Sequence, residues 1–98
     1  MYALIDGAAI RSRDELHDAL ARQLALPAWY GRNLDALFDC LTEMSEDCEI
    51  VLRGPEELFA ALGVYADVLQ AVLRDASTEN PHLRFSVENG AEDPAWEV

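Results

Sequence analysis

Three acidic residues recur at intervals of four along the segment PAWYGRNLDALFDCLTEMSED (residues 27–47): Asp35, Asp39 and Glu43. Residues four apart stack on one face of a helix, so these carboxylates would form a row. The chain contains no lysine, and the segment holds a single basic residue, Arg32. Such a row could be a solvated helix face, a metal site, a catalytic acid pair or a surface that attracts a basic partner.

The row lacks the features of a metal site or a catalytic site. It does not follow EF-hand spacing, and no histidine joins it. Acids on successive turns of a short helix are too exposed to hold different pKa values, as the two acids of a glycosidase must. Neither His17 nor His82 lies in a nucleophile motif, and we expect His17 at the surface or boundary of its helix. We therefore expect no catalytic residue, no metal and no cofactor, in a chain that is not an enzyme.

Aromatic side chains accompany the acidic row. A run of acids is usually a solvated face, and Asp35 fits this explanation because a carboxylate in the first turn complements the helix dipole. Asp39 lies a turn further along, where that benefit has faded. Trp29 and Tyr30 precede the helix, however, and Phe38 lies beside the acids. Aromatics next to carboxylates are typical of protein–protein hot spots. This favours a binding surface, in which we expect Tyr30 to be more buried than Trp29.

The charge of the whole chain excludes some partners. Its 98 residues carry 19 acids against 7 bases, a formal net charge of −12. Such a chain repels nucleic acid and anionic lipid and attracts basic proteins, so we expect no direct binding to nucleic acid or membrane. No apolar run approaches a membrane span, and Cys40 and Cys48 match neither CxxC nor zinc-site spacing. With no secretory signal before the first strand, we expect a cytoplasmic protein with both thiols free.

The apolar pattern predicts one α/β domain. Short apolar runs at 2–6, 49–53 and 82–89 are typical of strands. Helices are expected at 13–24, after an N-cap at Asn33, at 55–62 and at 65–77. The order β-α-α-β-α-α-β predicts a small three-stranded parallel sheet covered by about four helices, with the strand order left open. The expected buried face of the last helix comprises Tyr65, Val68, Leu69, Val72, Leu73 and Ala76.

The block LALPAWYGRNLDALFDCLT (24–42) closely resembles the signature of the barstar family, intracellular inhibitors of the secreted ribonuclease barnase. The first strand, the segment IRSRDELHDALARQLALP, the helix containing VLQAVLRDA and the final strand also match in kind and spacing. The similarity spans roughly residues 2–88. It implies a barstar-like fold and a barstar-like inhibitor domain over residues 1–89, followed by an additional acidic tail over residues 90–98.

The resemblance also implies how such a protein works: acidic helix residues imitate RNA phosphates and plug the active site of a basic ribonuclease. Asp39 matches the aspartate that enters the phosphate site, Asp35 matches one that pairs with basic groups at its mouth, and Asp75 could supply a peripheral charge. We expect a 1:1 complex with a secreted ribonuclease of the barnase-like, guanyl-specific kind, and a monomer when free. The implied contact residues are Trp29, Tyr30, Gly31, Asn33, Asp35, Phe38, Asp39, Thr42, Glu43, Met44 and Asp75.

Several of these positions depart from the family pattern. Phe38 stands where the family often has tryptophan, Trp29 replaces a tyrosine that packs on the enzyme, and Glu43 and Met44 replace a Gly-Trp pair at the edge of the contact. The departures imply the same class of partner but a different cognate enzyme. The alternative is an immunity or regulatory binding protein for a different toxin or another basic partner.

Overall fold

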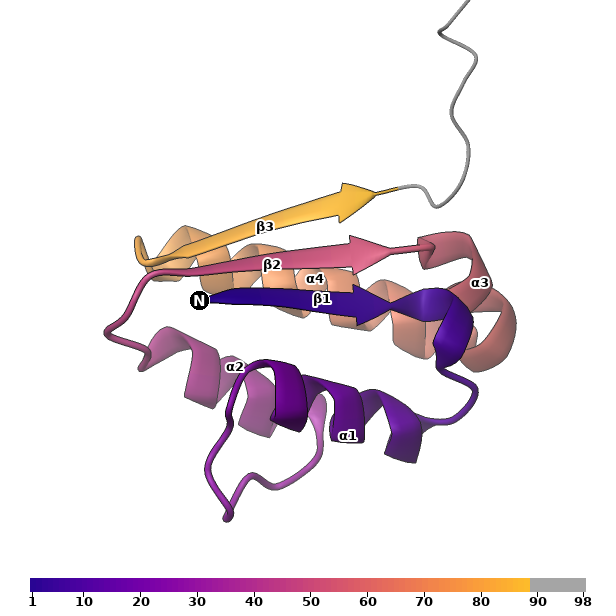
Figure 1. Cartoon of the computed structure of the whole chain (residues 1–98), viewed down its shortest axis with the longest axis horizontal. Coiled ribbons are helices and arrows are strands. Elements are labelled where there is room, and N and C mark those ends of the chain that lie inside the picture. Colours follow the sequence, from indigo (N-terminus) through magenta and orange to yellow (C-terminus); the bar gives the residue numbers. More distant parts are fainter. Residues whose placement is uncertain (89–98) are drawn as a thin grey trace, which may run out of the picture.

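The computed structural model describes residues 1–88 and has the expected α/β architecture (Figure 1). Three parallel strands lie in the order β1-β2-β3, which the sequence pattern had left open. The order along the chain confirms the expected alternation of strands and helices. The elements are β1 (Tyr2–Asp6), the 3-10 turn η1 (Gly7–Ala9), α1 (Arg13–Gln23), α2 (Leu34–Thr42), β2 (Cys48–Arg53), α3 (Pro55–Leu62), α4 (Val64–Glu79) and β3 (Leu83–Glu88).

The helix starts follow local capping signals. The Ser12 hydroxyl accepts the Glu15 N–H at 3.1 Å, and the Asn33 side chain accepts the Ala36 N–H at 2.7 Å. Each bond satisfies an N–H that has no partner inside its helix. Pro55 occupies the first turn of α3, where its missing N–H costs nothing. These signals explain why the predicted helix starts lie at the observed residue or one residue from it.

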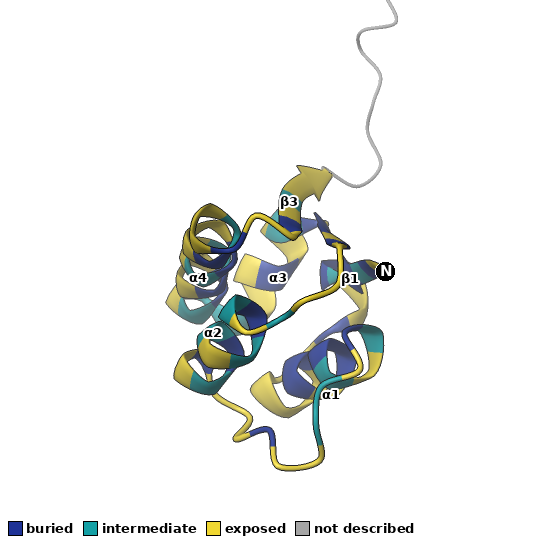
Figure 2. Cartoon of the chain, turned by 90° about the vertical axis from the view of Figure 1, so that its left-hand side faces the viewer, coloured by how far each residue is buried: buried dark blue, intermediate teal, exposed yellow. Residues whose placement is uncertain are grey.

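The sheet has helices on one face only. Figure 2 shows all four helices on the same side of the strands. Inward residues such as Ile5, Ile50 and Leu52 are fully buried in the core. On the opposite face Leu4 pairs across the strands with Val51, and Val51 is buried without belonging to that core. The expected helical cover is therefore one-sided, whereas most all-parallel sheets are buried on both faces.

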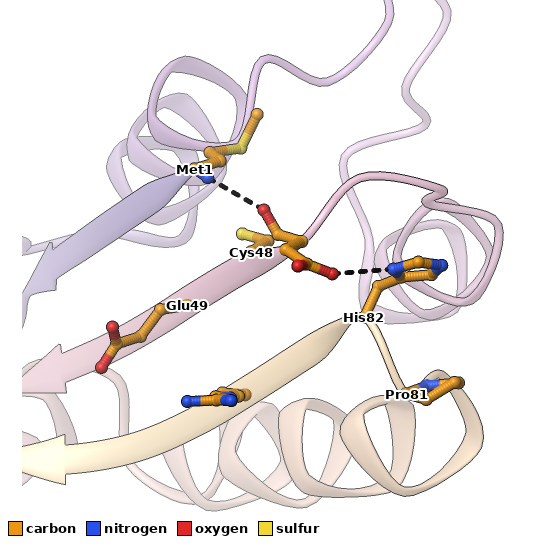
Figure 3. Close-up of a pocket in the computed structure, with 7 residues that line it drawn as sticks. Met1, Cys48, Glu49, Pro81 and His82 are labelled. Atoms are coloured by element: carbon orange, nitrogen blue, oxygen red, sulfur yellow. Dashed lines mark hydrogen bonds and ion pairs between the residues drawn. The ribbon is translucent and has the colours of Figure 1, made fainter.

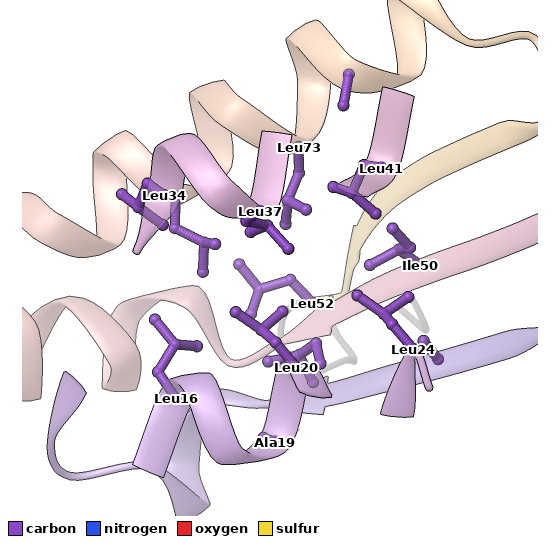
Figure 4. Packing of buried hydrophobic residues seen from close by; sticks show 14 of the residues in the cluster. Leu16, Ala19, Leu20, Leu24, Leu34, Leu37, Leu41, Ile50, Leu52 and Leu73 are labelled. Carbon is purple, nitrogen blue, oxygen red and sulfur yellow. The ribbon is translucent and has the colours of Figure 1, made fainter. Parts of the chain in front are cut away.

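Leucines from α1 and α2 form the centre of the core. Figure 4 shows Leu20 and Leu37 directed toward Ile50 and Leu52 of the central strand. One residue of the expected α4 face was placed wrongly: Val68 is 44% exposed. The buried face of α4 is instead centred on Ala66, Leu69, Leu73 and Ala76, spaced by three and four residues along one side of the helix.

His17 corrects a second expectation, because it is only 2% exposed and does not lie at the surface. Its Nδ1 lies 2.6 Å from the Tyr30 hydroxyl and its Nε2 lies 2.8 Å from the Tyr65 hydroxyl. A neutral imidazole has one donor and one acceptor, so it satisfies both contacts. Burial lowers the pKa of His17 below its ordinary value, and the positive charge of Arg32 lowers it further. The ring thus ties α1 to α4 and to the loop before α2.

Asn80 makes the corresponding connection at the other end of α2. It is 4% exposed, and its side-chain N–H groups donate to the carbonyl oxygens of Leu41 and Met44, both at 2.9 Å. Its side-chain oxygen accepts the His82 N–H at 2.9 Å. One amide therefore satisfies carbonyls at the C-terminal end of α2 and fixes the entry into β3.

Replacing Asn80 by alanine should lower the free energy of unfolding by about 2 kcal/mol or more, because it leaves buried carbonyls without a donor. Urea unfolding measures the change. The matched control is Glu79→Ala, one residue earlier and exposed, which should change the free energy by less than about 0.5 kcal/mol. Equal losses in the two variants would contradict the role of Asn80.

The buried histidine predicts a pH dependence of stability. The pKa of His17 is lower in the folded protein than in the unfolded chain, so the unfolded chain binds the proton first as pH falls. The His17 contribution to stability should therefore be complete above pH 6.5 and should decline below it, down to the lowered pKa. Urea unfolding at pH 7.5 and 5.5 should show a smaller decline for His17→Gln than for the unsubstituted chain; the same decline in both would contradict this explanation.

Candidate protein-binding surface

Helix α2 presents its acidic row to solvent because its opposite face is buried. Leu34, Leu37 and Leu41 pack into the core, so Asp35 and Asp39 emerge on the outer side. Glu43, the residue that caps the helix at its C-terminal end, is exposed as well. The periodicity of the sequence predicted this division, and the structure places the three carboxylates along one exposed surface of the protein.

No basic residue within residues 1–88 forms an ion pair with this row. The ion pairs in that part of the chain join Arg32 to Asp14 and Asp18, Arg53 to Glu88, and His82 to Asp47. Cys40 responds to the uncompensated field: burial raises the pKa of its thiol, and the negative charges of Glu43 and Asp39 raise it further. The surface is therefore suited to attract cations and to repel anions such as RNA.

The loop between α1 and α2 is held in one conformation before any partner binds. Ala25 (φ 52°) and Arg32 (φ 58°) adopt left-handed backbone angles that cost free energy for residues other than glycine. Arg32 compensates by contacting α1, with its guanidinium 2.9 Å from the Asp18 carboxylate and 3.1 Å from the Asp14 carbonyl oxygen. A loop ordered in advance loses less entropy on binding.

The two loop aromatics differ in exposure, as expected. Tyr30 is buried, with its hydroxyl on His17, whereas Trp29 is 75% exposed. Gly31 allows the loop to lie against the first turn of α2, since a Cβ there would be only 3.3 Å from the Ala36 Cβ. Tyr30 thus anchors the loop from inside, and Trp29 remains available to a partner.

The structure brings most of the predicted contact residues together, but their roles differ. The Thr42 hydroxyl donates to the Phe38 and Asp39 carbonyl oxygens within its own helix. Phe38 and Met44 are half-buried and pack partly against the core. Asp75 comes from a different element, as an exposed residue of the neighbouring helix α4. The loop and α2 therefore form one continuous surface, to which Asp75 is a separate contribution.

Three residues that position this surface were not identified from the sequence: His17, Tyr65 and Asn80. Their contacts with Tyr30 and with the end of α2 join residues that are 13 to 48 positions apart. For the histidine and the tyrosine, no local spacing indicates such a contact. The Asn80-Pro81 pair does predict the end of a helix, but it does not predict which groups the Asn80 side chain contacts.

A polar hollow lies at the N-terminal ends of the strands, lined by Met1, Asp47, Cys48 and His82 among others. Asp47 contacts two groups here: its backbone oxygen accepts from the Met1 amine, and its carboxylate lies 2.8 Å from His82 Nδ1. Figure 3 shows Met1 and His82 at this hollow. The contact with His82 lowers the pKa of Asp47. Burial raises the pKa of the nearby Cys48 thiol, which makes it a poor nucleophile. These groups satisfy one another and do not form a nucleophile–base arrangement.

The described part of the chain gives no indication of a metal or membrane site. Among residues 1–88, no three His, Cys, Asp or Glu side chains are grouped so that they could hold a metal ion. No helix in the same range is long and apolar enough to cross a membrane. The acidic tail expected at 90–98 lies outside the described residues.

Comparison with known proteins identifies the family of the chain. A family model described as "Barstar (barnase inhibitor)" matches residues 1–89. The Bacillus subtilis (strain 168) protein named "Putative ribonuclease inhibitor YrdF" is 42% identical over 77 residues, which are 78% of this chain and 85% of that protein. The family model covers all of the strands and helices described above. The chain belongs to the barstar family.

Proposed function

We propose that this protein is a non-enzymatic inhibitor of a basic, barnase-like ribonuclease. The observation that carries the proposal is the exposed carboxylate row of α2, which forms no ion pair among the described residues and lies beside Trp29 on an ordered loop. The family description and the name of the Bacillus subtilis relative both refer to inhibition of ribonucleases. Residues 1–89 would form the inhibitor domain, acting in the cytoplasm on an enzyme destined for secretion.

The inhibition follows from charge imitation. A ribonuclease active site must hold RNA phosphates, and it does so with arginine, lysine and histidine side chains. The Asp39 carboxylate, presented by a rigid helix, would accept charge-assisted hydrogen bonds from those groups at the phosphate position. Asp35, one turn earlier, would pair with basic groups at the mouth of the site. The inhibitor offers the charge of the substrate without a bond that can be cleaved.

The remaining surface would complete a 1:1 contact. Trp29 supplies a large exposed aromatic side chain at the margin of the acidic row, which is typical of an interface anchor. The backbone around Gly31 and Asn33 and the helix end at Thr42–Met44 would border the enzyme, and Asp75 would add charge from α4. The net charge of −12 would steer the protein toward a basic enzyme from a distance.

The central role of Asp39 predicts that Asp39→Ala raises the inhibition constant for barnase at least about 30-fold. The loss corresponds to roughly 2–5 kcal/mol for one partner of a buried charge pair, a range drawn in part from the barnase–barstar complex itself. Inhibition of RNA cleavage measures the constant. The free energy of unfolding should change by less than about 0.5 kcal/mol, because Asp39 is exposed and makes no ion pair within residues 1–88.

Asp67→Ala is the matched control, since Asp67 is an exposed aspartate on α4, away from the acidic row. It removes the same side chain and charge, so it should leave the inhibition constant nearly unchanged. If the two variants lost inhibition equally, a general effect of net charge would replace the specific role of Asp39. If Asp39→Ala lost stability and inhibition together, Asp39 would be structural.

Charge steering predicts a strong effect of salt on association. Raising sodium chloride from 50 mM to 500 mM shortens the screening length from about 14 Å to about 4 Å. The association rate constant with barnase, measured by stopped-flow fluorescence, should fall by about tenfold or more, and the dissociation rate constant should change much less. An association rate that does not depend on salt would be incompatible with steering by the net charge.

A further inference from the structure

A shallow groove adjoins the acidic row at the C-terminal end of α2. It has a volume of about 270 Å³ and lies between the loop after α1 and the last turn of α2. Leu26 and Pro27 line it from the loop, and Met44 lines it from the end of the helix. Trp29 and Glu43 also line it, and no arginine, lysine or histidine does. The groove therefore combines apolar walls, one exposed aromatic ring and one carboxylate.

These three features match the aliphatic stem and the charged head of a long cationic side chain. The aliphatic stem of a long cationic residue packs on apolar walls while its charged head stays polar. A guanidinium group stacks on a tryptophan ring and forms hydrogen bonds with a carboxylate. Cys40 also lines the groove; burial raises the pKa of its thiol, and the negative charges of the nearby Glu43 and Asp39 raise it further. The negative field of these carboxylates favours a cation over a neutral occupant of the same shape.

We propose that this groove binds an arginine side chain of the partner, with the stem against Leu26 and Met44, and the guanidinium between Trp29 and Glu43. Arginine fits better than lysine, because a planar guanidinium both stacks on the ring and pairs with the carboxylate. The identity of the partner rests on the proposed function, whereas the preference for arginine rests on the groove alone. Glu43 and Met44 then select among basic ribonucleases, and Asp39 supplies the charge imitation that such enzymes have in common.

The preference of the groove for an arginine side chain can be tested on the full chain without a ribonuclease. N-acetyl-arginine amide is titrated into the isotope-labelled protein, with the Trp29 indole N–H and the Met44 methyl group as NMR reporters. N-acetyl-citrulline amide has the same shape without the charge, and N-acetyl-norleucine amide represents an apolar occupant. The arginine compound should shift both reporters in a saturable manner and bind at least about threefold more tightly than either of the other compounds. Absence of saturable shifts with the arginine compound, or equal binding of citrulline or norleucine, would overturn the proposal.

Two substitutions isolate the carboxylate. Glu43→Gln should weaken binding of the arginine compound about threefold, whereas Glu56→Gln, on α3, removes the same charge far along the chain from the groove and should leave binding unchanged. Equal affinities in these two variants would also overturn the proposal. Barnase inhibition is measured with the same proteins. Failure of the unsubstituted chain to inhibit barnase, other barnase-like ribonucleases and the ribonuclease of its own source cell would reject the proposed function, whereas the arginine titration decides the groove separately.

Discussion

The burial of one leucine face of α2 determines what the rest of the molecule can present. Leu34, Leu37 and Leu41 enter the core, so the opposite face of a rigid helix must point outward. Two buried polar contacts then fix where that helix lies. His17 holds the loop that leads into it, and Asn80 holds its last turn. The carboxylates of α2 are therefore positioned by the core and by these two side chains, and not by contacts of their own.

This arrangement separates stability from recognition. Asp35 and Asp39 make no ion pair among the described residues, and their mutual repulsion opposes folding slightly. The core and the buried hydrogen bonds offset that cost. Under the proposed function these groups have to stay without an ion pair inside the protein, since a paired arginine would neutralise the charge offered to the enzyme. Arg32 lines a surface hollow together with Asp35, but its ion pairs are with Asp14 and Asp18 of α1, which is consistent with this constraint.

Much of the fold could be predicted from the sequence, because its signals are local. The caps at Ser12 and Asn33 and the spacing of the leucines are enough to predict α1, α2 and the outward direction of the acids. The wrong predictions concern residues whose burial is determined by tertiary contacts. The α4 sequence has two adjacent apolar faces, and the face that is buried in the folded protein is the one without Val68. His17 looked like a boundary residue, because its two tyrosine partners approach it only in the folded chain.

In the proposed function this protein occupies a ribonuclease active site, with one inhibitor bound per enzyme. The most direct measurement is a titration of the purified, unsubstituted protein into barnase at a concentration well above the expected dissociation constant, with RNA cleavage as the readout. Cleavage activity should fall linearly and be lost at one equivalent of the protein, and RNA added in excess beforehand should slow the loss by competition. Full cleavage activity in the presence of a large excess of the protein, for barnase, for other barnase-like ribonucleases and for the ribonuclease of the source cell, would contradict the proposed function.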